Sequence, residues 1–364
     1  MIEYENLSKT NALFIKGFKK NLNQFFEKGW YILGDNVTKF EEEYAKYCGT
    51  NYCVSVASGL DAMIIALETI NLPKGSEILV PSNTYIATIL AIVRAGYKPM
   101  LVEPDIKTYN IDPDLIEKNI SKNTRAILIT HLYGRPCKMD RIQQIVNHFN
   151  LFLLEDCAQA HGATYLEQKV GSFGIGCHSF YPTKNLGALG DGGAITFNDE
   201  DLYEKIKAYR NYGSIKKYEN KYIGLNSRLD EIQAIFLREK LKGLNRINEK
   251  KIELSIVYDS LLDERFIKPK KNSPEKHVYH IYNVRHPKRD SIKIELMKNN
   301  IASEIHYPIP PHNQNGYKNV IKGNYPISEE IHATTLSLPI SYSHSKDEIA
   351  KVSEVLNSIL KKYR

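Results

Sequence analysis

The chain has 364 residues, of which 42% are hydrophobic and 25% charged, and its formal net charge is +7. The balance is typical of a globular protein, and the length exceeds one ordinary core, so we expect a large and a smaller domain. No apolar run approaches the roughly 20 residues of a membrane helix, the first residues lack a signal-peptide pattern, and no basic stripe is interleaved with aromatics. We therefore expect a cytoplasmic protein with neither a membrane nor a nucleic-acid partner.

Short apolar runs alternate with amphipathic stretches between about residues 50 and 200. The apolar runs lie at residues 78–80, 100–102, 126–129, 151–154 and 194–197, and helical patterns lie near 59–70, 86–95, 113–119 and 140–149. This alternation is typical of an α/β fold in which helices cover both faces of a mostly parallel central sheet.

The character of the chain changes beyond a pair of long helices. Two long, charged helices are predicted over 227–245 and 246–263, followed by a strand over 278–285, a helix near 289–299 and a final helix near 345–362. We divide the chain into a large domain, residues 1–245, and a smaller C-terminal α+β domain, residues 246–364.

The most informative residues are a carboxylate and a lysine that follow a buried strand. Asp156 comes directly after the apolar run Leu151–Leu154, and Lys184 lies in the turn-rich segment Ser179–Gly187. Open α/β sheets build ligand sites at this end of their strands. The pair suits pyridoxal phosphate (PLP), which forms a Schiff base with a lysine while an aspartate keeps its pyridine nitrogen protonated. Spacing alone favours a surface lysine and a helix-capping aspartate, so the flanking residues decide.

Two predicted helix starts carry groups that suit a phosphate. Ser58 and Gly59 precede apolar residues spaced i, i+3, i+4 and i+7, and the free N–H groups of such a start bind anions, although an ordinary N-cap has the same pattern. Asn226 stands just before a helix that Ser227 is expected to cap, with Asp230 in its first turn. An asparagine there is also a donor for phosphate.

Further residues near Asp156 allow two interpretations. Gln159 is spaced to reach the cofactor ring or its 3-oxygen, whereas His161 either touches the cofactor or is a polar residue of the following turn. The glycines of Gly171–Gly176 and Gly187–Gly193 match neither a phosphate loop nor a dinucleotide fingerprint, and we interpret both segments as tight loops.

The cysteines argue against disulfide bonds and zinc. Their number is odd and no C-x-x-C pair occurs, so we predict no metal site. Cys157 adjoins Asp156. We expect its side chain to fill space behind the strand, which is a simpler role than that of a catalytic thiol. The five positions are Cys48, Cys53, Cys137, Cys157 and Cys177.

These motifs resemble the DegT/DnrJ/EryC1/StrS group of PLP-dependent nucleotide-sugar aminotransferases, which share the aspartate-aminotransferase fold (PLP fold type I). The resemblance runs almost from end to end. The matching segments, in order, are Leu33-Gly34, Ala57–Gly59, Pro81–Tyr85, His131–Gly134, Glu155–Ala160, Ser179–Gly187, Asn226–Ala234 and Tyr307–His312.

The resemblance implies a role for each matching residue. Lys184 would bind PLP and act as general base, and Asp156 would pair with the pyridinium nitrogen. Tyr85 would stack on the ring, and Gln159 would contact its 3-oxygen region. The residues implied for the phosphate are Ser58, Gly59, Ser179 and, from a partner subunit, Asn226. Those implied for the sugar are Tyr181, Tyr218, His306, Tyr307 and His312. Leu60 departs from the family, where many members carry Thr, so one hydroxyl contact to the phosphate is missing.

The resemblance also implies the reaction. A transaminase of this kind moves an amino group from L-glutamate, through pyridoxamine phosphate (PMP), to a nucleotide-linked keto-sugar. Sugar dehydratases of the family carry histidine in place of the lysine, and Lys184 argues against that chemistry. A non-catalytic sugar-sensing regulator would need a damaged site, whereas Lys184, Asp156 and Gln159 are all present.

The segment Tyr212–Glu231 resembles most closely the branch that acts on 3-keto sugars. Those enzymes make dTDP-3-amino-3,6-dideoxyhexoses from dTDP-3-keto-6-deoxyhexoses. A 4-keto substrate stays open if the loop before Asn226 only packs a dimer. We expect a homodimer with shared active sites, because the resemblance assigns Asn226 to the neighbouring subunit's phosphate.

Overall fold

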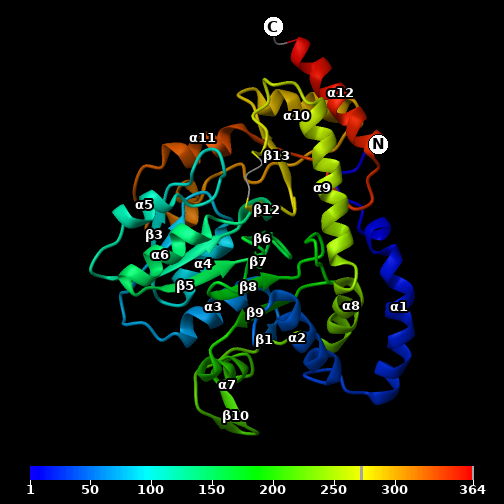
Figure 1. Ribbon diagram of the computed structural model, residues 1–364. Coiled ribbons are helices and arrows are strands. Elements are labelled where there is room, and N and C mark those ends of the chain that lie inside the picture. Colours follow the sequence, from blue (N-terminus) through cyan, green and yellow to red (C-terminus); the bar gives the residue numbers. More distant parts are fainter. Residues whose placement is uncertain (271–273, 363–364) are drawn as a thin grey trace.

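The computed structural model describes residues 1–270 and 274–362 and centres on a seven-stranded sheet (Figure 1). The strands lie in the order β1-β9-β8-β5-β4-β2-β3. Pairing is parallel from β3 through β2, β4 and β5 to β8, whereas β9 is antiparallel to both β8 and β1, so the prediction of a mostly parallel sheet is confirmed. The strand bounds are Tyr52–Val56 (β1), Glu77–Pro81 (β2), Lys98–Val102 (β3), Thr124–Thr130 (β4), Phe152–Asp156 (β5), Ile175–Ser179 (β8) and Gly193–Phe197 (β9).

Helices cover both faces of this sheet because successive strand residues point to opposite sides. In β2, Ile78 and Val80 belong to one hydrophobic core and Leu79 to the other. All five residues of β2 are buried, which explains its uninterrupted apolar run. The four helices predicted between the strands are present. The flanking helices are α3 (Gly59–Thr69), α4 (Ile86–Arg94), α5 (Pro113–Lys118), α6 (Met139–Phe149) and α7 (Glu200–Tyr209).

Helix α8 (Glu231–Leu241) packs against α1 (Leu7–Lys28) and α2 (Asp35–Cys48). The sequence placed its start near Ser227 with that residue as the cap, and this is wrong. The N-cap is Asp230, and the Ser227 hydroxyl instead donates to Asp61 at 2.6 Å and accepts from the backbone N–H of Ala57 at 3.0 Å. The serine is therefore used to tie the segment before α8 to the start of α3.

A second core lies in the C-terminal part, formed by residues between Leu254 and Leu360. A capping box between Ser345 and Glu348 starts the last helix. The predicted strand 278–285 is shorter than expected, because the N–H groups of Val278 and Ile281 bond to the carbonyls of residues 134 and 133. The elements are α9 (Leu244–Leu261), β13 (Tyr282–Arg285), α10 (Arg289–Lys298), α11 (Pro326–Thr334), β14 (Thr335–Leu338), antiparallel to β13, and α12 (Lys346–Lys361).

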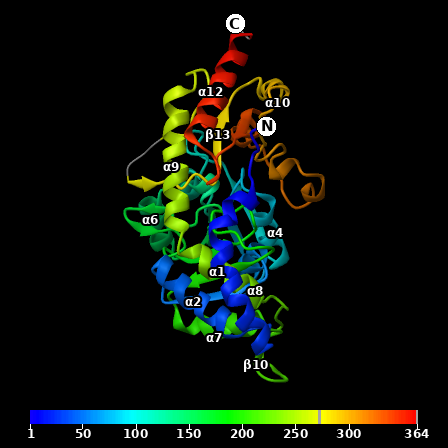
Figure 2. The same cartoon turned by 90° about the vertical axis from the view of Figure 1, so that its right-hand side faces the viewer.

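The remaining elements are short. One of them, the β10–β11 hairpin, projects from the body of the molecule in both views (Figures 1 and 2). They are β6 (Thr164–Tyr165), β7 (Gln168–Lys169), η1 (Leu132–Gly134), β10 (Ser214–Lys216), β11 (Glu219–Asn220), β12 (Glu275–Lys276), η2 (Pro311–Asn313) and η3 (Asn315–Tyr317). Across residues 1–270 and 274–362, every helix is too short or too polar to cross a membrane.

The two-domain division stays a prediction. Helix α9 begins at Leu244, beside the proposed boundary, and carries the chain from the large sheet to the C-terminal core (Figure 1). The first residues return to that core, since Ile2 bridges to Ile301 in parallel.

Candidate active site

Asp156 and Lys184 lie at the carboxyl edge of the large sheet. Asp156 is the last residue of β5, and it pairs with Cys177 of the neighbouring parallel strand β8. Lys184 follows β8 in a turn closed by a 2.9 Å bond from its N–H to the carbonyl of Tyr181. Because adjacent parallel strands end at the same edge, the carboxylate and the amine belong to one site.

Asp156 is almost fully buried, with 5% of its surface exposed. Its Oδ2 accepts from the Thr88 hydroxyl at 2.8 Å, and its Oδ1 accepts from the N–H of Ala158 at 3.1 Å. Burial raises the pKa of Asp156, while the two hydrogen bonds and the charge of Lys184 lower it. The carboxylate is thus held in a fixed orientation by donors that stabilise its charged form.

Lys184 has a depressed pKa. Burial lowers it to about 8, Asp156 counteracts this, and the nearby cation of Lys251 lowers it further. The Lys184 Nζ lies 3.4 Å from Nε2 of His280. Lys251 also donates to the side-chain oxygen of Asn185 at 2.9 Å and so holds the turn that carries Lys184. An amine with this pKa is partly neutral near neutral pH, as a general base requires.

The start of α3 comes close to the end of β8. Ser58 is the N-cap, and its hydroxyl accepts from the N–H of Asp61 at 3.1 Å. A Cβ at position 59 would lie 2.5 Å from the Cβ of Ser179, so only glycine lets the two segments approach. Ser58, Gly59 and Ser179, which the sequence assigned to a phosphate, are therefore gathered beside free helix N–H groups.

Gln159, Tyr307 and Tyr85 form a connected group. The amide of Gln159 accepts from the N–H of Tyr133 at 2.7 Å and donates to the Tyr307 hydroxyl at 3.0 Å. The rings of Tyr85 and Tyr307 are 5.0 Å apart, and Tyr85 is 49% exposed. One face of Tyr85 thus remains available to a ligand.

A cavity of about 280 Å³ opens beside Lys184. His306 and Tyr181 line it, as the sequence expected of sugar-binding residues. Burial lowers the pKa of His306 to about 4, so its ring is neutral at neutral pH. The full lining is Tyr4, Glu5, Tyr181, Thr183, His280, Ile281, Glu304, His306 and Ile340.

Three assigned residues lie elsewhere in the single chain. His312 faces Glu329, with 3.0 Å between Nε2 and the carboxylate. Tyr218 is 88% exposed on the projecting hairpin (Figure 2), and Asn226 is exposed where the backbone bridges to Asn211. Their roles as ligands stay predictions.

His161 lies behind the site. Its ring stacks on His178 and Phe180, with centroids 5.9 and 5.7 Å apart, and burial lowers its pKa well below the usual value. Of the two interpretations from the sequence, the structure favours a packed core residue.

Several residues of the site carry no sequence signal that we recognised. Thr88 lies on a correctly predicted helix, but nothing in its periodicity marks a partner for Asp156. Tyr4 reaches the cavity from the start of the chain, and His280 from the incorrectly extended strand. Their roles depend on contacts between distant segments.

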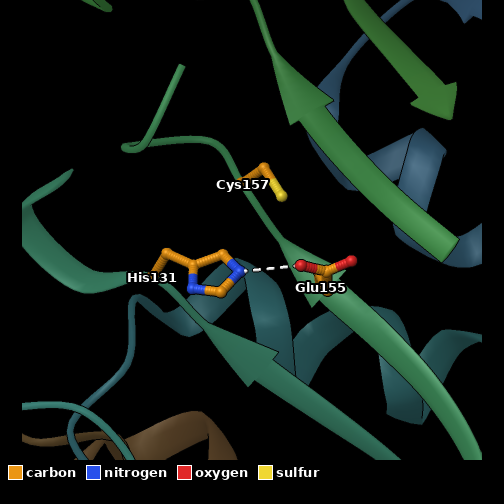
Figure 3. A group of neighbouring side chains, drawn as sticks. All are labelled: His131, Glu155 and Cys157. Atoms are coloured by element: carbon orange, nitrogen blue, oxygen red, sulfur yellow. Dashed lines mark hydrogen bonds and ion pairs between the residues drawn. The ribbon is translucent and has the colours of Figure 1, made fainter. Parts of the chain in front are cut away.

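His131, Glu155 and Cys157 form a buried group behind Asp156 that has the composition of a metal site (Figure 3). Nδ1 of His131 accepts from the N–H of Cys137 at 3.0 Å, so its Nε2 carries the proton and donates to Glu155 at 3.0 Å. Glu155 also accepts from three backbone N–H groups, those of Gly171, Phe173 and Gly174.

The nitrogen and oxygen atoms of this group that could bind a metal already have hydrogen-bond partners. Both nitrogens of His131 and both oxygens of Glu155 are engaged, and burial raises the pKa of the Cys157 thiol well above its usual value. Since metals bind thiolates rather than thiols, we interpret the group as a link between the end of β4 and the loop before β8. It fixes the ends of the strands that carry the site.

The residues at the sheet edge fit PLP by their chemistry. Asp156 suits a pyridinium, Lys184 suits the aldehyde carbon, and the start of α3, opened by Gly59, suits a phosphate. When bound, PLP supplies an electron sink for the bond changes at the carbon that gains or loses nitrogen.

The fold and these groups define a PLP-dependent aminotransferase of fold type I. The chain belongs to the DegT/DnrJ/EryC1/StrS aminotransferase family, which it matches over residues 14–357. It is 48% identical to the dTDP-3-amino-3,6-dideoxy-alpha-D-galactopyranose transaminase of Aneurinibacillus thermoaerophilus, over 98% of this chain and 99% of that protein.

Two solved structures are similar along nearly the whole chain. One is DesV of S. venezuelae in complex with a ketimine intermediate, with a TM-score of 0.95, 36% identity and 97% of each chain covered. The other is NtdA of Bacillus subtilis with bound cofactor PMP, with a TM-score of 0.91 and 28% identity over 98% of this chain and 84% of that one. The expected fold, class of enzyme and cofactor are confirmed.

Proposed function

We propose that this enzyme transfers the amino group of L-glutamate to dTDP-3-keto-6-deoxyhexose and so makes a dTDP-3-amino-3,6-dideoxyhexose. The observation that carries the proposal is the placement of Lys184 and Asp156 at one sheet edge, beside a cavity lined by hydroxyl and imidazole groups. The relative from Aneurinibacillus thermoaerophilus, named for such a product and matched over almost its full length, supports the choice of sugar.

In this proposal Lys184 would hold the cofactor and would take up and return the proton of the reacting carbon. Its pKa of about 8 gives it a neutral amine and a competent conjugate acid at working pH. The donors Thr88 and Ala158 favour the charged form of Asp156, which would keep the pyridine nitrogen of the cofactor protonated. Tyr85 would cover the cofactor ring, and Gln159 would contact its 3-oxygen side.

The cavity beside Lys184 takes the sugar. Its polar residues suit hydroxyl groups, with His306 and Tyr181 in its wall and Tyr307 bonded to Gln159 behind it. A pocket that hydrogen-bonds its substrate can differ greatly in kcat/KM between a ketone and a hydroxyl at the same position. We therefore expect the enzyme to select its substrate by the position of the keto group.

The active enzyme is a homodimer with shared sites. Asn226 and Tyr218 are exposed in one chain, as are Ile215 on the hairpin and Ile223 just after it, by 59% and 96%. Exposed apolar residues of this kind are typical of a surface that another subunit covers. We assign Asn226 to the phosphate, and Tyr218 to the sugar, of the neighbouring subunit, and His312 to the border of the pocket. We place the enzyme in the cytoplasm, with neither nucleic acid nor a membrane as partner.

The sugar is tested directly. The enzyme and L-glutamate are incubated separately with dTDP-3-keto- and dTDP-4-keto-6-deoxyglucose, and the position of nitrogen is determined by NMR. Amination at C3 is expected. Efficient amination at C4 with none at C3 would favour the alternative, a 4-keto aminotransferase, and turnover of neither sugar would favour a sensing role.

A further inference from the structure

His280 lies beside Lys184, the residue that the proposed function makes the base. Its Nε2 is 3.4 Å from Nζ of Lys184. Within residues 1–270 and 274–362, this imidazole is the only hydrogen-bond partner of the amine. His280 also lines the cavity of about 280 Å³ that opens beside Lys184. The imidazole therefore lies where the amine meets the space for a substrate.

The backbone at His280 is held from two directions. The segment 278–281 bonds through two N–H groups to the loop after β4. From the other side, Lys251 of α9 donates to the carbonyl of His280 at 3.3 Å and to the side-chain oxygen of Asn185 at 2.9 Å. Because Asn185 directly follows Lys184, one cation joins the two segments that carry the imidazole and the amine.

The direction of the hydrogen bond follows from charge. A protonated lysine amine has three N–H groups and no lone pair, so it can only donate. Burial, and then the cations of Lys184 and Lys251, lower the pKa of His280 well below its usual value, so its ring is neutral and Nε2 can accept. The proton of the ring is then on Nδ1, to which no residue in the described part of the chain is hydrogen-bonded.

This bond favours the charged form of Lys184, because a charged donor makes a stronger hydrogen bond than a neutral one. Its effect on the pKa of Lys184 is therefore opposite to that of burial and of Lys251. The bond also fixes the end of a long and flexible side chain. The titratable groups around the pair are Glu5, Asp156, His161, Lys240, Lys251 and His306. The wall of the cavity adds Tyr4, Tyr181 and Glu304.

We propose that His280 is a positioning residue that accepts a hydrogen bond from the free amine of Lys184 and holds this amine at the edge of the cavity. The proposal rests on the proposed role of Lys184 as base, and it does not depend on the identity of the sugar. Since the same amine serves both half-reactions, His280 should affect the reaction of L-glutamate as much as that of the keto-sugar.

The first test measures the pKa of Lys184 in the cofactor-free protein, from the pH dependence of its modification by an acylating reagent. His280→Phe keeps a ring and removes the acceptor of the ammonium group. We expect the inflection, near pH 8 in the wild type, to fall by about one pH unit, a tenfold change in proton affinity. Loss of packing alone would expose the amine and move the inflection up, toward 10.5.

Two further variants control this measurement. His280→Gln supplies an amide oxygen as acceptor in place of Nε2, so its inflection should stay near that of the wild type. His286→Phe is the matched control, because His286 lies just beyond the other end of β13 and is half-buried like His280. Its ring packs on Phe266, with centroids 5.5 Å apart, and the substitution should leave the inflection unchanged.

The second test compares the two half-reactions of the PLP-loaded enzyme. Loss of one positioned hydrogen bond should lower the rates with L-glutamate and with the keto-sugar by about tenfold each in His280→Phe. His280→Gln should recover most of both rates. A residue that only contacts the sugar would instead lower the rate with the keto-sugar and leave the rate with L-glutamate unchanged.

A measurement on the wild type decides the matter if His280→Phe does not fold. Histidine labelled with ¹⁵N is incorporated, and the signals of His280 are assigned by their loss in His280→Gln. At about pH 6, where Lys184 is protonated, we expect a pyridine-type Nε2 in His280, as an acceptor requires. A pyrrole-type Nε2 would overturn the proposal.

The variants provide two further ways to overturn it. One is an unchanged or raised inflection in His280→Phe, and the other is a loss of rate confined to the keto-sugar. If the wild type aminates no nucleotide keto-sugar, the proposed function fails. The pKa of Lys184 and the half-reaction with L-glutamate then still decide whether His280 positions the amine.

Discussion

The Thr88 hydroxyl donates a 2.8 Å hydrogen bond to Oδ2 of Asp156, from the first turns of α4 to the end of β5. The same hydroxyl lies 2.8 Å from that of Thr84, which in turn lies 2.9 Å from that of Thr130. A buried chain of hydroxyls thus supports the charged form of the aspartate on which the cofactor depends.

Thr88→Val should weaken cofactor binding. The substitution keeps the shape of the side chain and removes the donor, so the pKa of Asp156 rises further and its charge is less available to a pyridinium. Because a hydrogen bond to a charged group contributes about 1.5–3 kcal/mol, we expect the Kd for PLP to rise about 10- to 100-fold. Titration of apoenzyme with PLP measures this.

Two further variants control that experiment. Thr88→Ser should recover most of the affinity because it restores the hydroxyl. Thr69→Val changes a buried threonine that bonds a carbonyl of its own helix, and it should leave the Kd alone. Equal Kd values for Thr88→Val and wild type would show that the Thr88–Asp156 hydrogen bond does not affect how Asp156 binds the cofactor.

The pKa of Lys184 predicts the pH dependence of its reactivity. In cofactor-free enzyme the rate at which an acylating reagent modifies Lys184, followed by peptide mass spectrometry, should rise with an inflection near pH 8. Lys251→Met removes a cation that lowers this pKa, so the inflection should move to higher pH. Lys250→Met, one position earlier on α9, is the control. An inflection near the ordinary lysine value in the wild type would contradict the burial of the amine.

The same shift has a consequence for stability. The folded pKa of Lys184 lies below its unfolded value of 10.5, so between pH 8 and 10.5 the unfolded chain binds more protons. The contribution of Lys184 to stability therefore rises with pH across this window and is unfavourable below it. In Lys184→Met apoenzyme this part of the pH dependence of unfolding should disappear.

We expect Glu155 to stabilise the fold rather than to bind a metal. Glu155→Ala would leave buried N–H groups and His131 without their acceptor, and breaking such a buried pair costs about 3–5 kcal/mol, so Tm should fall clearly. Cys157→Ala should cost far less, because its thiol is neutral. Treatment with a chelator should change neither Tm nor activity, and a loss of either would indicate that the group binds metal.

Sharing of sites between subunits is tested with mixed dimers. Lys184→Ala and Asn226→Ala should each be inactive or strongly impaired. Subunit exchange should then restore one intact site per hybrid dimer, because each variant supplies what the other lacks. Mixtures with proven exchange that recover no activity would argue against a partner's role for Asn226.

The parts of the fold that the sequence predicted are those with local signals. Apolar runs marked the strands β2, β3, β4, β5 and β9, and Asp156 was placed correctly at the end of β5. The strands β1 and β8 were not predicted, although Lys184 follows β8. The antiparallel direction of β9 has no such signal. The spacing around Ser227 is typical of a helix cap. Its hydroxyl instead donates to Asp61, which is distant in the sequence.

The same limit explains what the sequence missed in the site. Tyr4 and His306 are brought together by the packing of the first residues on the C-terminal core, and Tyr4 lies in no motif. His280 is near Lys184 because residues 278–281 bond to the loop after β4. Such contacts become visible only when the whole chain is folded.

Reduction of the PLP-loaded enzyme with borohydride, followed by peptide mapping, tests whether Lys184 carries the cofactor. We expect the cofactor to become attached to Lys184, and we expect L-glutamate added beforehand to prevent attachment by converting the cofactor to its amino form. Lys28→Ala, an exposed lysine on α1, should behave as the wild type, and Lys184→Ala should not be labelled. Attachment at another lysine, or near-normal turnover by Lys184→Ala, would show that Lys184 is not the cofactor-binding lysine.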